Sequence, residues 1–370
     1  QIQGVTRETI SLMGIHMIFY YLTVASAFLI LASAAKPKLK DYHFKAVRQE
    51  LLDEVNSRTY LWKAAVPIRF ENATVAEVKR QLGTFVPRDP EYVAPLQSPI
   101  SYSDVKDTPE SFDARKEWPE CAHIIGHVRD QSNCGSCWAF SSTESFNDRY
   151  CIMTKDYKTF LSPEDTNSCC HGLFCGLSQG CNGGQPDAAW HWFTKSGVST
   201  GGDYSNMDDG SSCKPYSFEA CAHHSKPPEG MKSCDEVPSE RTVKCVSSCS
   251  DKYYDSDYSK DKHYASKSYL VIGEEHMKRS LLEKGSLSVA IEVYEDFELY
   301  QSGIYHHVTG SYLGGHAIKL IGWGVEEGTP YWICINSWNT MWGEDGSFRI
   351  LRGKNEVGIE TTAVAGDVHV

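Results

Sequence analysis

Gln-Ser-Asn-Cys-Gly-Ser-Cys-Trp-Ala-Phe, at residues 131–140, is the segment from which the architecture of this chain can be inferred. Beyond it, an apolar stripe with helical spacing predicts an amphipathic helix whose first turn contains Cys137. The stripe consists of Ala139, Thr143, Phe146 and Tyr150. A thiol in that first turn faces unpaired N–H groups and the positive end of the helix dipole, which favour its ionised form. Because the thiolate is the nucleophilic form, we expect Cys137 to be a reactive thiol.

Two alternatives remain open for this segment on its own. Cys134 and Cys137 have the Cys-x-x-Cys spacing of a redox pair or of half a zinc site. A catalytic thiolate, in contrast, needs an imidazole that takes and returns a proton, and a third group that orients the imidazole. Candidates for these two partners therefore distinguish a nucleophile from the alternatives.

Two later segments supply such partners. Residues 313–323 predict a strand that opens on His316, and residues 331–336 predict a second strand that closes on Asn336. If this hairpin turns about Glu326, His316 and Asn336 lie opposite each other with their Cβ atoms about 5 Å apart. The pairing favours a catalytic histidine over a merely structural one.

Cys134 to Trp138 matches the pattern Cys-Gly-[Ser/Ala]-Cys-[Trp/Tyr] at every position. With the two later motifs, the chain resembles the papain-family cysteine proteases of the cathepsin B type. The resemblance implies an α+β, papain-like fold with a helical left lobe, an antiparallel β-barrel-like right lobe, the active-site cleft between them, and an N-terminal propeptide. It assigns Cys137 as nucleophile, His316 as general base and acid, Asn336 as orienting amide and Gln131 as oxyanion-hole donor. Acyl transfer by these groups needs no cofactor and no metal.

The resemblance also assigns the residues that would line the cleft. These are Asn182, Gly183, Gly184 and Gly315 along the substrate backbone, and Trp338 over the histidine. Glycines allow a peptide backbone to approach closely. Thr362 stands where cathepsin B has an acidic residue that accepts arginine at P2, the second residue before the cleaved bond. We therefore expect apolar or aromatic side chains to be preferred at P2.

An insertion separates the thiol from its partners. The histidine and the asparagine follow Cys137 by 179 and 199 residues, whereas the family spacing is about 130 to 150. The inserted segment, residues 213–249, contains the adjacent histidines His223 and His224. Two histidines on a loop are usually solvated, and zinc binding would need a third ligand. The segment resembles, however, the occluding loop of cathepsin B, whose histidine pair binds the C-terminal carboxylate of a substrate.

Imidazolium groups attract a carboxylate at acidic pH and release it on deprotonation. The resemblance therefore implies removal of C-terminal dipeptides in addition to endopeptidase activity. One of the two ion pairs that hold this loop in the family is altered here. Lys226 stands where arginine is usual, and Met341 stands where the aspartate partner of that arginine would be. Asp130 matches the partner of the first histidine. Without the second ion pair we expect a looser loop and more endopeptidase activity than is typical of the family.

The chain has 14 cysteines, all between Cys121 and Cys334. In a chain with a secretory signal, this density indicates disulfides. Cys137 is set aside as the nucleophile, and Cys334, in an apolar strand, is predicted to be a buried free thiol. The sequence cannot choose among the possible pairings of the others. The resemblance implies the pairs Cys121–Cys151, Cys134–Cys181, Cys169–Cys245, Cys170–Cys175, Cys213–Cys249 and Cys221–Cys234.

Residues 1–34 are interpreted as upstream sequence and a signal peptide. Residues 17–35 form an apolar run that ends in small residues, as before a signal-peptidase site. The alternative is a signal anchor, since 19 residues could just span a bilayer. Cleavage would leave no stable membrane anchor. We expect the secretory route, with a lysosome, an equivalent acidic compartment or the exterior as destination. Asn72, in the chain's single sequon, would then be glycosylated.

Residues 35–107 are predicted to be an inhibitory propeptide. Two amphipathic helices are indicated, one by Val47, Leu51, Leu52 and Val55 and another by Val75, Val78 and Leu82. Such a segment could be any helical spacer. Residues 56–62, however, resemble the start of a cathepsin B propeptide, and residues 82–85 resemble the part laid across the cleft. The mature peptidase domain would then cover residues 108–370.

Composition excludes some functions. With 370 residues, 41% of them hydrophobic, the chain can bury a large core, and its net charge of −12 argues against nucleic acid as a partner. Expected partners are peptide and protein substrates, the chain's own propeptide and cystatin-like inhibitors, and we expect a monomer. Two rival interpretations are a papain-like endopeptidase without exopeptidase activity and an inactive disulfide-rich binding scaffold. The scaffold should have lost one of the four assigned catalytic residues, and none is missing.

Overall fold

The computed structural model describes most of the chain after residue 42. The described ranges are 43–67, 70–86, 99–100, 108–222, 229–233, 237, 241–361 and 363–370. The predicted signal peptide lies outside them, as do His223, His224, Lys226, Cys234 and Thr362. Within these ranges, no helix has both the length and the apolar character needed to cross a membrane.

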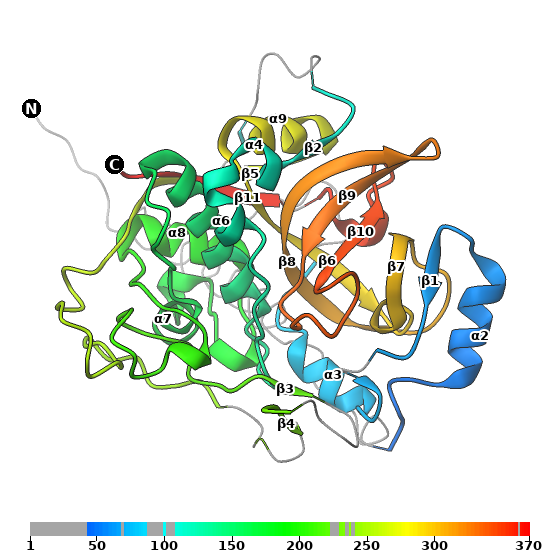
Figure 1. The fold of residues 1–370 in the computed structure, drawn as a ribbon, viewed down its shortest axis with the longest axis horizontal. Coiled ribbons are helices and arrows are strands. Elements are labelled where there is room, and N and C mark those ends of the chain that lie inside the picture. Colours follow the sequence, from blue (N-terminus) through cyan, green and yellow to red (C-terminus); the bar gives the residue numbers. More distant parts are fainter. Residues whose placement is uncertain are drawn as a thin grey trace, which may run out of the picture.

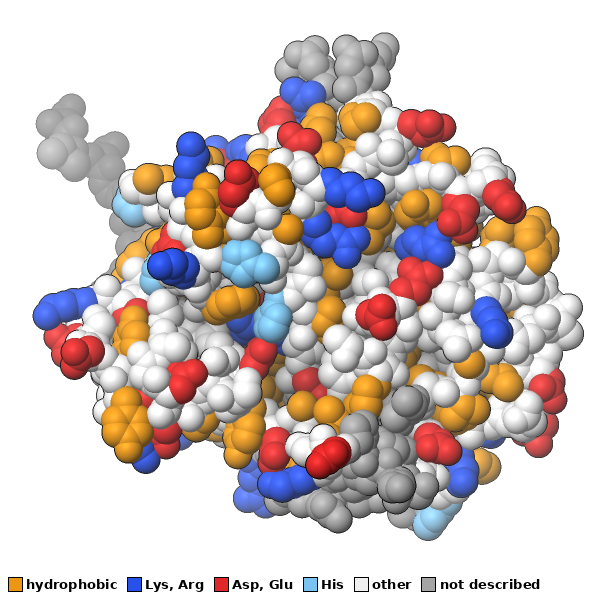
Figure 2. Space-filling view, viewed as in Figure 1, with side chains coloured by type: hydrophobic (Ala, Val, Ile, Leu, Met, Phe, Trp, Pro, Cys, Tyr) orange, Lys and Arg blue, Asp and Glu red, His pale blue; other side chains and the backbone are white. Residues whose placement is uncertain are grey.

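The helices between residues 114 and 195 gather on one side of the molecule and a large sheet lies on the other, in agreement with the predicted α+β class (Figure 1). The helical side contains α4 (Ala114–Glu117), α5 (Ala122–Ile125), α6 (Cys137–Thr154), α7 (Pro163–Cys169) and α8 (Pro186–Lys195), with the 3₁₀ turns η3 (Pro119–Cys121), η4 (Leu173–Cys175), η5 (Gly180–Asn182) and η6 (Tyr204–Asn206). On the face shown in Figure 2, acidic and basic side chains are interspersed, and no continuous basic patch is seen there.

The sheet has the strand order β1-β7-β10-β9-β8-β6-β11-β5, and β2 pairs with β8. Its strands are β1 (Trp62–Ala64), β2 (Phe112–Asp113), β5 (Ala265–Val271), β6 (Leu287–Tyr294), β7 (Tyr300–Tyr305), β8 (Tyr312–Glu326), β9 (Thr329–Ile335), β10 (Ser347–Leu351) and β11 (Ala363–Val368). The pairing of β10 with β7 is parallel and the others are antiparallel. The remaining elements are α9 (Glu274–Lys284), η7 (Phe297–Leu299), η8 (Glu356–Gly358) and a small parallel pair, β3 (Cys221–Ala222) with β4 (Lys232–Ser233).

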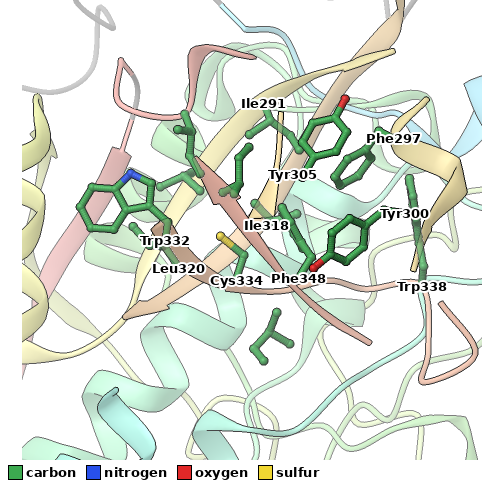
Figure 3. Close-up of a cluster of buried hydrophobic side chains, with 14 of the residues drawn as sticks. Ile291, Phe297, Tyr300, Tyr305, Ile318, Leu320, Trp332, Cys334, Trp338 and Phe348 are labelled. Atoms are coloured by element: carbon green, nitrogen blue, oxygen red, sulfur yellow. The ribbon is translucent and has the colours of Figure 1, made fainter. Parts of the chain in front are cut away.

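Aromatic side chains fill the core of the sheet (Figure 3). Phe297 lies at their centre, with ring centroids 5.0 to 5.8 Å from those of Tyr305, Trp338, Trp342 and Phe348. Pairs with tilted or edge-on geometry stabilise a core beyond their buried area. Because Trp338 belongs to this packed group, its indole is held in a fixed position.

The long helix α6 corrects one prediction from the sequence. Every residue from Cys137 to Arg149 is buried, so the helix is not amphipathic with one solvated face. α7 and α8 pack on it together with strands β6, β8 and β11, and buried charged side chains such as Asp148 and Arg149 have hydrogen-bond partners inside the protein. The predicted stripe marked only the most apolar part of a helix that is enclosed all round from Cys137 to Arg149.

Arg149 shows how a charged residue is accommodated there. Its guanidinium donates five hydrogen bonds, to the carbonyl oxygens of Gly285, Ser286 and Gly366 and to the hydroxyls of Tyr269 and Ser280. A buried cation is tolerated when its donors are satisfied in this way. These bonds attach the C-terminal half of α6 to the sheet and to α9.

The N-terminal segment, residues 43–86, folds against the sheet and then enters the cleft (Figure 1). Its two predicted helices are confirmed as α2 (Gln49–Arg58) and α3 (Val75–Gln81). Between them, β1 pairs antiparallel with β7, which would be the outermost strand of the sheet without it. Trp62 is buried there and donates from Nε1 to the carbonyl oxygen of His306 at 2.9 Å. Pairing along a free strand edge gives the segment a backbone-based docking site.

Disulfides stabilise the helical side and the inserted segment. The structure contains Cys121–Cys151, Cys134–Cys181, Cys169–Cys245, Cys170–Cys175 and Cys213–Cys249, which are pairs that the family resemblance implied. Cys221 is also disulfide-bonded, and its expected partner, Cys234, lies outside the described residues. Cys137 and Cys334 are free and buried, so the only free thiols of the described cysteines are the two that were set aside.

Candidate active site

Cys137 is the first residue of α6 and is fully buried. Its Sγ accepts a hydrogen bond from the backbone N–H of Gly83 at 3.3 Å, and the N–H of Ala317 also donates to it. Burial raises the pKa of the Cys137 thiol to about 11, although these N–H groups act in the opposite direction. The thiolate expected from the helix terminus is therefore not the favoured form while the N-terminal segment covers the site, because loss of solvation outweighs the backbone donors.

His316 and Asn336 lie together at the sheet, where His316 directly precedes Ala317, whose N–H donates to the thiol. The distance from Nε2 of His316 to Oδ1 of Asn336 is 2.7 Å, and both residues are buried. An amide oxygen can only accept, so Nε2 carries the proton and Nδ1 is left as the basic nitrogen. Trp338 stacks on the imidazole with ring centroids 4.6 Å apart and shields this contact from water.

The hairpin that carries these residues has a different register from the one predicted. Its turn consists of Glu327 and Gly328, with φ of 48° and 79°, and is not centred on Glu326. Two positive φ values suit a tight turn that matches the twist of the strands. A bulge in β8 shifts the ladder again. His316 and Asn336 are therefore not ladder partners, and Asn336 follows the end of β9 and reaches the imidazole through its side chain.

Gln131 presents its amide nitrogen to the cleft. Oε1 of Gln131 accepts a hydrogen bond from the hydroxyl of Ser337 at 2.7 Å, which fixes the orientation of the amide. Nε2 donates to the carbonyl oxygens of Cys134 at 2.7 Å and of Gln81 at 2.8 Å. A donor held in place in this way can stabilise the oxyanion of an acyl-transfer step.

A strip of the N-terminal segment occupies the space between these groups. The carbonyl oxygen of Gly83 accepts from the N–H of Gly184 at 2.8 Å, and the N–H of Thr84 donates to the carbonyl oxygen of Gly315 at 3.2 Å. Two of the glycines expected to bind substrate backbone are thus bound to the chain's own backbone. With the predicted roles of Gln131 and Cys137, a substrate would have to place the oxygen of one carbonyl at Gln131 and the carbon of the same carbonyl at the sulfur. Here the carbonyl at Gln131 is that of Gln81, and the N–H at the sulfur is that of Gly83. These belong to neighbouring peptide groups, so the strip does not present a cleavable bond in that geometry.

Residues 108–366 match the family model described as papain family cysteine protease. The chain belongs to this family. "Cathepsin B-like cysteine proteinase 5" of Caenorhabditis elegans is 44% identical over 326 residues, which cover 86% of this chain and 89% of the relative. A cathepsin B-like cysteine proteinase of Schistosoma japonicum is 42% identical over 308 residues, covering 82% and 86% respectively. The protease is accordingly a cathepsin B-like peptidase, a hydrolase.

Solved structures agree with this assignment. The protease is similar to proCathepsin B S9 from Trypanosoma congolense, with a TM-score of 0.73, 33% identity and coverage of 88% of this chain and 100% of that one. Digestive procathepsin L 3 of Tenebrio molitor, at 21% identity and a TM-score of 0.57, shares the fold. The predicted papain-like fold is therefore confirmed.

Only some of the other residues that were expected to line the cleft are found there. Gly183, Gly184, Gly315 and Trp338 line the occupied cleft, whereas Asn182 is exposed at the end of η5. The histidine pair and Thr362 lie outside the described residues. Within the described ranges, no three His, Cys, Asp or Glu side chains are grouped as metal ligands would be.

Two residues that the sequence did not indicate contribute to the site. Ser337 orients Gln131, and its position directly after Asn336 could have suggested a role. Phe70 of the N-terminal segment packs edge-on against Trp338, with ring centroids 5.0 Å apart and planes at 88°. No sequence pattern pointed to Phe70, because its partner lies in a distant part of the chain.

The base of the inserted segment contacts a buried acid of α7. Oε2 of Glu164 accepts from the N–H of Ser217 at 3.0 Å, while Oε1 is buried without a hydrogen-bond partner in the described structure. Burial raises the pKa of Glu164 from 4.5 to about 7. The protonated acid is therefore the form that this site favours.

A pH dependence of stability follows from Glu164. Its folded-state pKa lies above the unfolded value, so its contribution is complete below about pH 4.5 and is lost as the pH rises through about 7. We expect Glu164→Gln to remove up to about 3 kcal/mol of the fall in unfolding free energy between pH 5 and pH 8. Urea unfolding at both pH values measures this, with exposed Glu327→Gln as control. An unchanged pH dependence in Glu164→Gln would contradict the assignment.

Proposed function

We propose that the protease cleaves peptide bonds with Cys137 as nucleophile, His316 as general base and acid, Asn336 as orienting amide and Gln131 as oxyanion donor. The observation that carries the proposal is the 2.7 Å contact between His316 and Asn336 beside the thiol at the start of α6. Such a trio has the nucleophile, base and orienting group that acyl transfer requires.

The reaction then runs in two balanced steps. Sγ of Cys137 bonds to the substrate carbonyl carbon, the C–N bond breaks, and His316 delivers a proton to the leaving amine. The oxyanion that forms in between is held by Nε2 of Gln131 and the backbone N–H of Cys137, each donor contributing about 3 kcal/mol to transition-state stabilisation. Water, deprotonated by His316, then attacks the thioester, which releases the carboxylic acid and restores the thiol.

Residues 35–107 would act as an inhibitory propeptide in this scheme. Their described part supports this role, because it occupies Gln131, covers Cys137 and bonds to Gly184 and Gly315. Cleavage between this segment and the domain at residues 108–370 would open the cleft. The thiol would then regain solvent and could pair with the neighbouring imidazole, and both changes favour ionisation.

We further infer that the inserted segment, residues 213–249, makes the protease a C-terminal dipeptidase as well as an endopeptidase. Replacing both His223 and His224 by alanine should lower dipeptide release from a peptide with a free C terminus by roughly 10- to 100-fold, because charge-assisted bonds to the carboxylate are lost. Cleavage of the same peptide with an amidated C terminus should be unchanged. Both rates are measured by quantifying the released fragments at pH 5.

Exposed His171, outside the inserted segment, provides the control, and His171→Ala should retain dipeptide release. If the double variant released dipeptides at the rate of the unmodified enzyme, the histidine pair would not be what binds the carboxylate. The rival interpretation as a pure endopeptidase would stand if the unmodified enzyme released no dipeptides. The ion pair of the family that is missing at Lys226 and Met341 leads to a second expectation. The unmodified enzyme should cut the peptide with an amidated C terminus better than the peptide with a free C terminus. Equal or slower cleavage would contradict a loosened loop.

Substrate preference at P2 is expected to depend on Thr362. Without a carboxylate there, a cation at P2 would be buried unpaired, so the enzyme should hydrolyse a Phe-Arg substrate at least about 10-fold faster than an Arg-Arg substrate, measured as kcat/KM. Thr362→Glu should narrow this difference. Comparable values for both substrates in the unmodified enzyme would contradict the expectation.

The setting in which the enzyme works is part of the proposal. Disulfides between described cysteines favour an oxidising compartment, and Asn72 is exposed before α3, where a glycan can be accommodated. We therefore propose the secretory route and an acidic destination, with peptides, proteins and cystatin-like inhibitors as partners of a monomeric enzyme. The inactive scaffold is disfavoured, because all four assigned groups lie around one cleft.

A further inference from the structure

A buried ion cluster lies between the two lobes, away from the cleft residues. Nζ of Lys319, on β8, lies 3.2 Å from Oδ2 of Asp148 and 3.7 Å from Oε2 of Glu144, both on α6. The exposed fractions of these side chains are 1% for Lys319, 0% for Asp148 and 7% for Glu144. Ser286 also donates from its hydroxyl to Asp148 at 2.5 Å. Charges buried to this extent depend on one another for compensation.

The cluster connects the two elements that carry the reacting groups. Glu144 and Asp148 follow Cys137 by seven and eleven residues, so all three lie on one face of α6. Lys319 follows His316 by three residues on β8. Among the ion pairs of the described residues, these are the ones that join α6 to β8. Cys137 is on α6 and His316 is on β8, so the ion pairs that fix the position of α6 relative to β8 also affect the distance between the thiol and the imidazole.

The two carboxylates share one ammonium group. Burial raises the pKa of both Glu144 and Asp148, and Lys319 lowers both. Among the described residues, Oε1 of Glu144 has no hydrogen-bond partner, and Glu144 lines a small cavity together with His127 and Arg129. Removal of Lys319 would therefore leave acids buried against each other without their closest cation.

Stability alone does not account for this arrangement. Apolar side chains of similar volume often replace a buried ion pair without loss of stability, because desolvation cancels most of the Coulomb attraction. What a buried ion pair can provide is a defined geometry between two elements. Misplacement of reacting groups by about 1 Å can lower a rate roughly 100-fold.

We propose that Lys319, held by Glu144 and Asp148, is a positioning residue that sets the approach of His316 to Cys137. The proposal rests on the proposed function, since it assumes that these two groups form the reacting pair. A thiolate that is paired with an imidazolium is alkylated rapidly in acid, where an isolated thiol is not ionised. The rate of alkylation of Cys137 at pH 5 therefore reports the geometry of the pair directly.

The experiment uses the processed enzyme, which is obtained from the full chain by proteolytic removal of the N-terminal segment. Lys319→Met is expected to lower the rate constant for alkylation of Cys137 by iodoacetamide at least about 10-fold at pH 5, and to change it less than about 2-fold at pH 9, where ionisation no longer needs the imidazole. kcat should fall by a similar factor with KM nearly unchanged. Lys319→Arg, which restores the cation, should recover most of both rates.

Tyr269→Phe is the matched control. It removes a hydrogen bond between Arg149 of α6 and the sheet without touching the ion cluster, so its alkylation profile should stay normal even though its melting temperature falls. If Lys319→Met does not fold, Glu144→Gln and Asp148→Asn replace it and should each lower the pH 5 rate about 3-fold or more. A normal profile in the folded variants would overturn the proposal. Absence of acid-range alkylation in the unmodified enzyme would instead refute the proposed reacting pair.

Discussion

Replacement of Cys137 by alanine is expected to lower kcat/KM for peptide hydrolysis by roughly 10⁴- to 10⁶-fold, the loss found when a covalent nucleophile is removed. The other groups would still bind the peptide and stabilise an oxyanion, but no thioester could form. Because the side chain is fully buried at the start of α6 and alanine is a good helix former, the fold should survive. Hydrolysis of a fluorogenic peptide by the processed enzyme measures the effect.

Cys334 provides a matched control for this prediction. It is the second buried free thiol of the described residues, and it lies in an apolar part of β9. Cys334→Ala should cost about 1 kcal/mol of stability at most and leave kcat/KM within about 2-fold. Substantial hydrolysis by Cys137→Ala, or an equal loss in Cys334→Ala, would show that the nucleophile is wrongly assigned.

Gly83→Ala is expected to weaken inhibition by the N-terminal segment roughly 100-fold or more. A Cβ atom at this position would lie 1.8 Å from the carbonyl oxygen of Gly135, which is backbone and cannot turn aside. The strip must then move out of the cleft and lose the bond from its N–H to Cys137 and the bond from Gly184 to its carbonyl. Overpacking and two lost hydrogen bonds together account for the expected size.

The measurement is the inhibition constant of separately made residues 35–107 against the processed enzyme, with and without the substitution. Thr84→Val is the control, because it removes only a 3.4 Å side-chain contact with Gln185 and keeps the backbone bonds, so it should change the constant less than about 3-fold. If the unmodified segment fails to inhibit at micromolar concentration, its role as a propeptide is refuted. If Gly83→Ala inhibits as well as the unmodified segment, the contact at Gly135 is not what holds the strip.

Local patterns were sufficient for much of the fold. The two N-terminal helices follow from apolar spacing, and the hairpin between His316 and Asn336 follows from alternating apolar residues around a turn. The predicted register of that hairpin was wrong. The register depends on a two-residue turn and a bulge, and these follow from backbone geometry that several sequences can adopt. The predicted contact between His316 and Asn336 is nevertheless present. Two side chains near the end of a strand can meet without being directly opposite each other in the ladder.

The ionisation of the thiol could not be obtained from the sequence. The position of Cys137 at a helix N-terminus favours the thiolate, and the structure has the thiol at that position with a raised pKa. The difference comes from Gly83 and its neighbours, which exclude water from a site more than fifty residues further along the chain. Desolvation depends on what covers a group in space, and no local pattern contains that information.

By itself, the sequence determined which chemical groups the protein possesses and the elements that carry them, because side-chain chemistry and backbone periodicity are properties of short segments. The tertiary structure alone decided which groups meet: that Ser337 turns the amide of Gln131, that Phe70 covers Trp338, and that Lys319 faces the acids of α6. Such meetings depend on how distant segments pack, and the free energy of packing is shared among the many residues of the core.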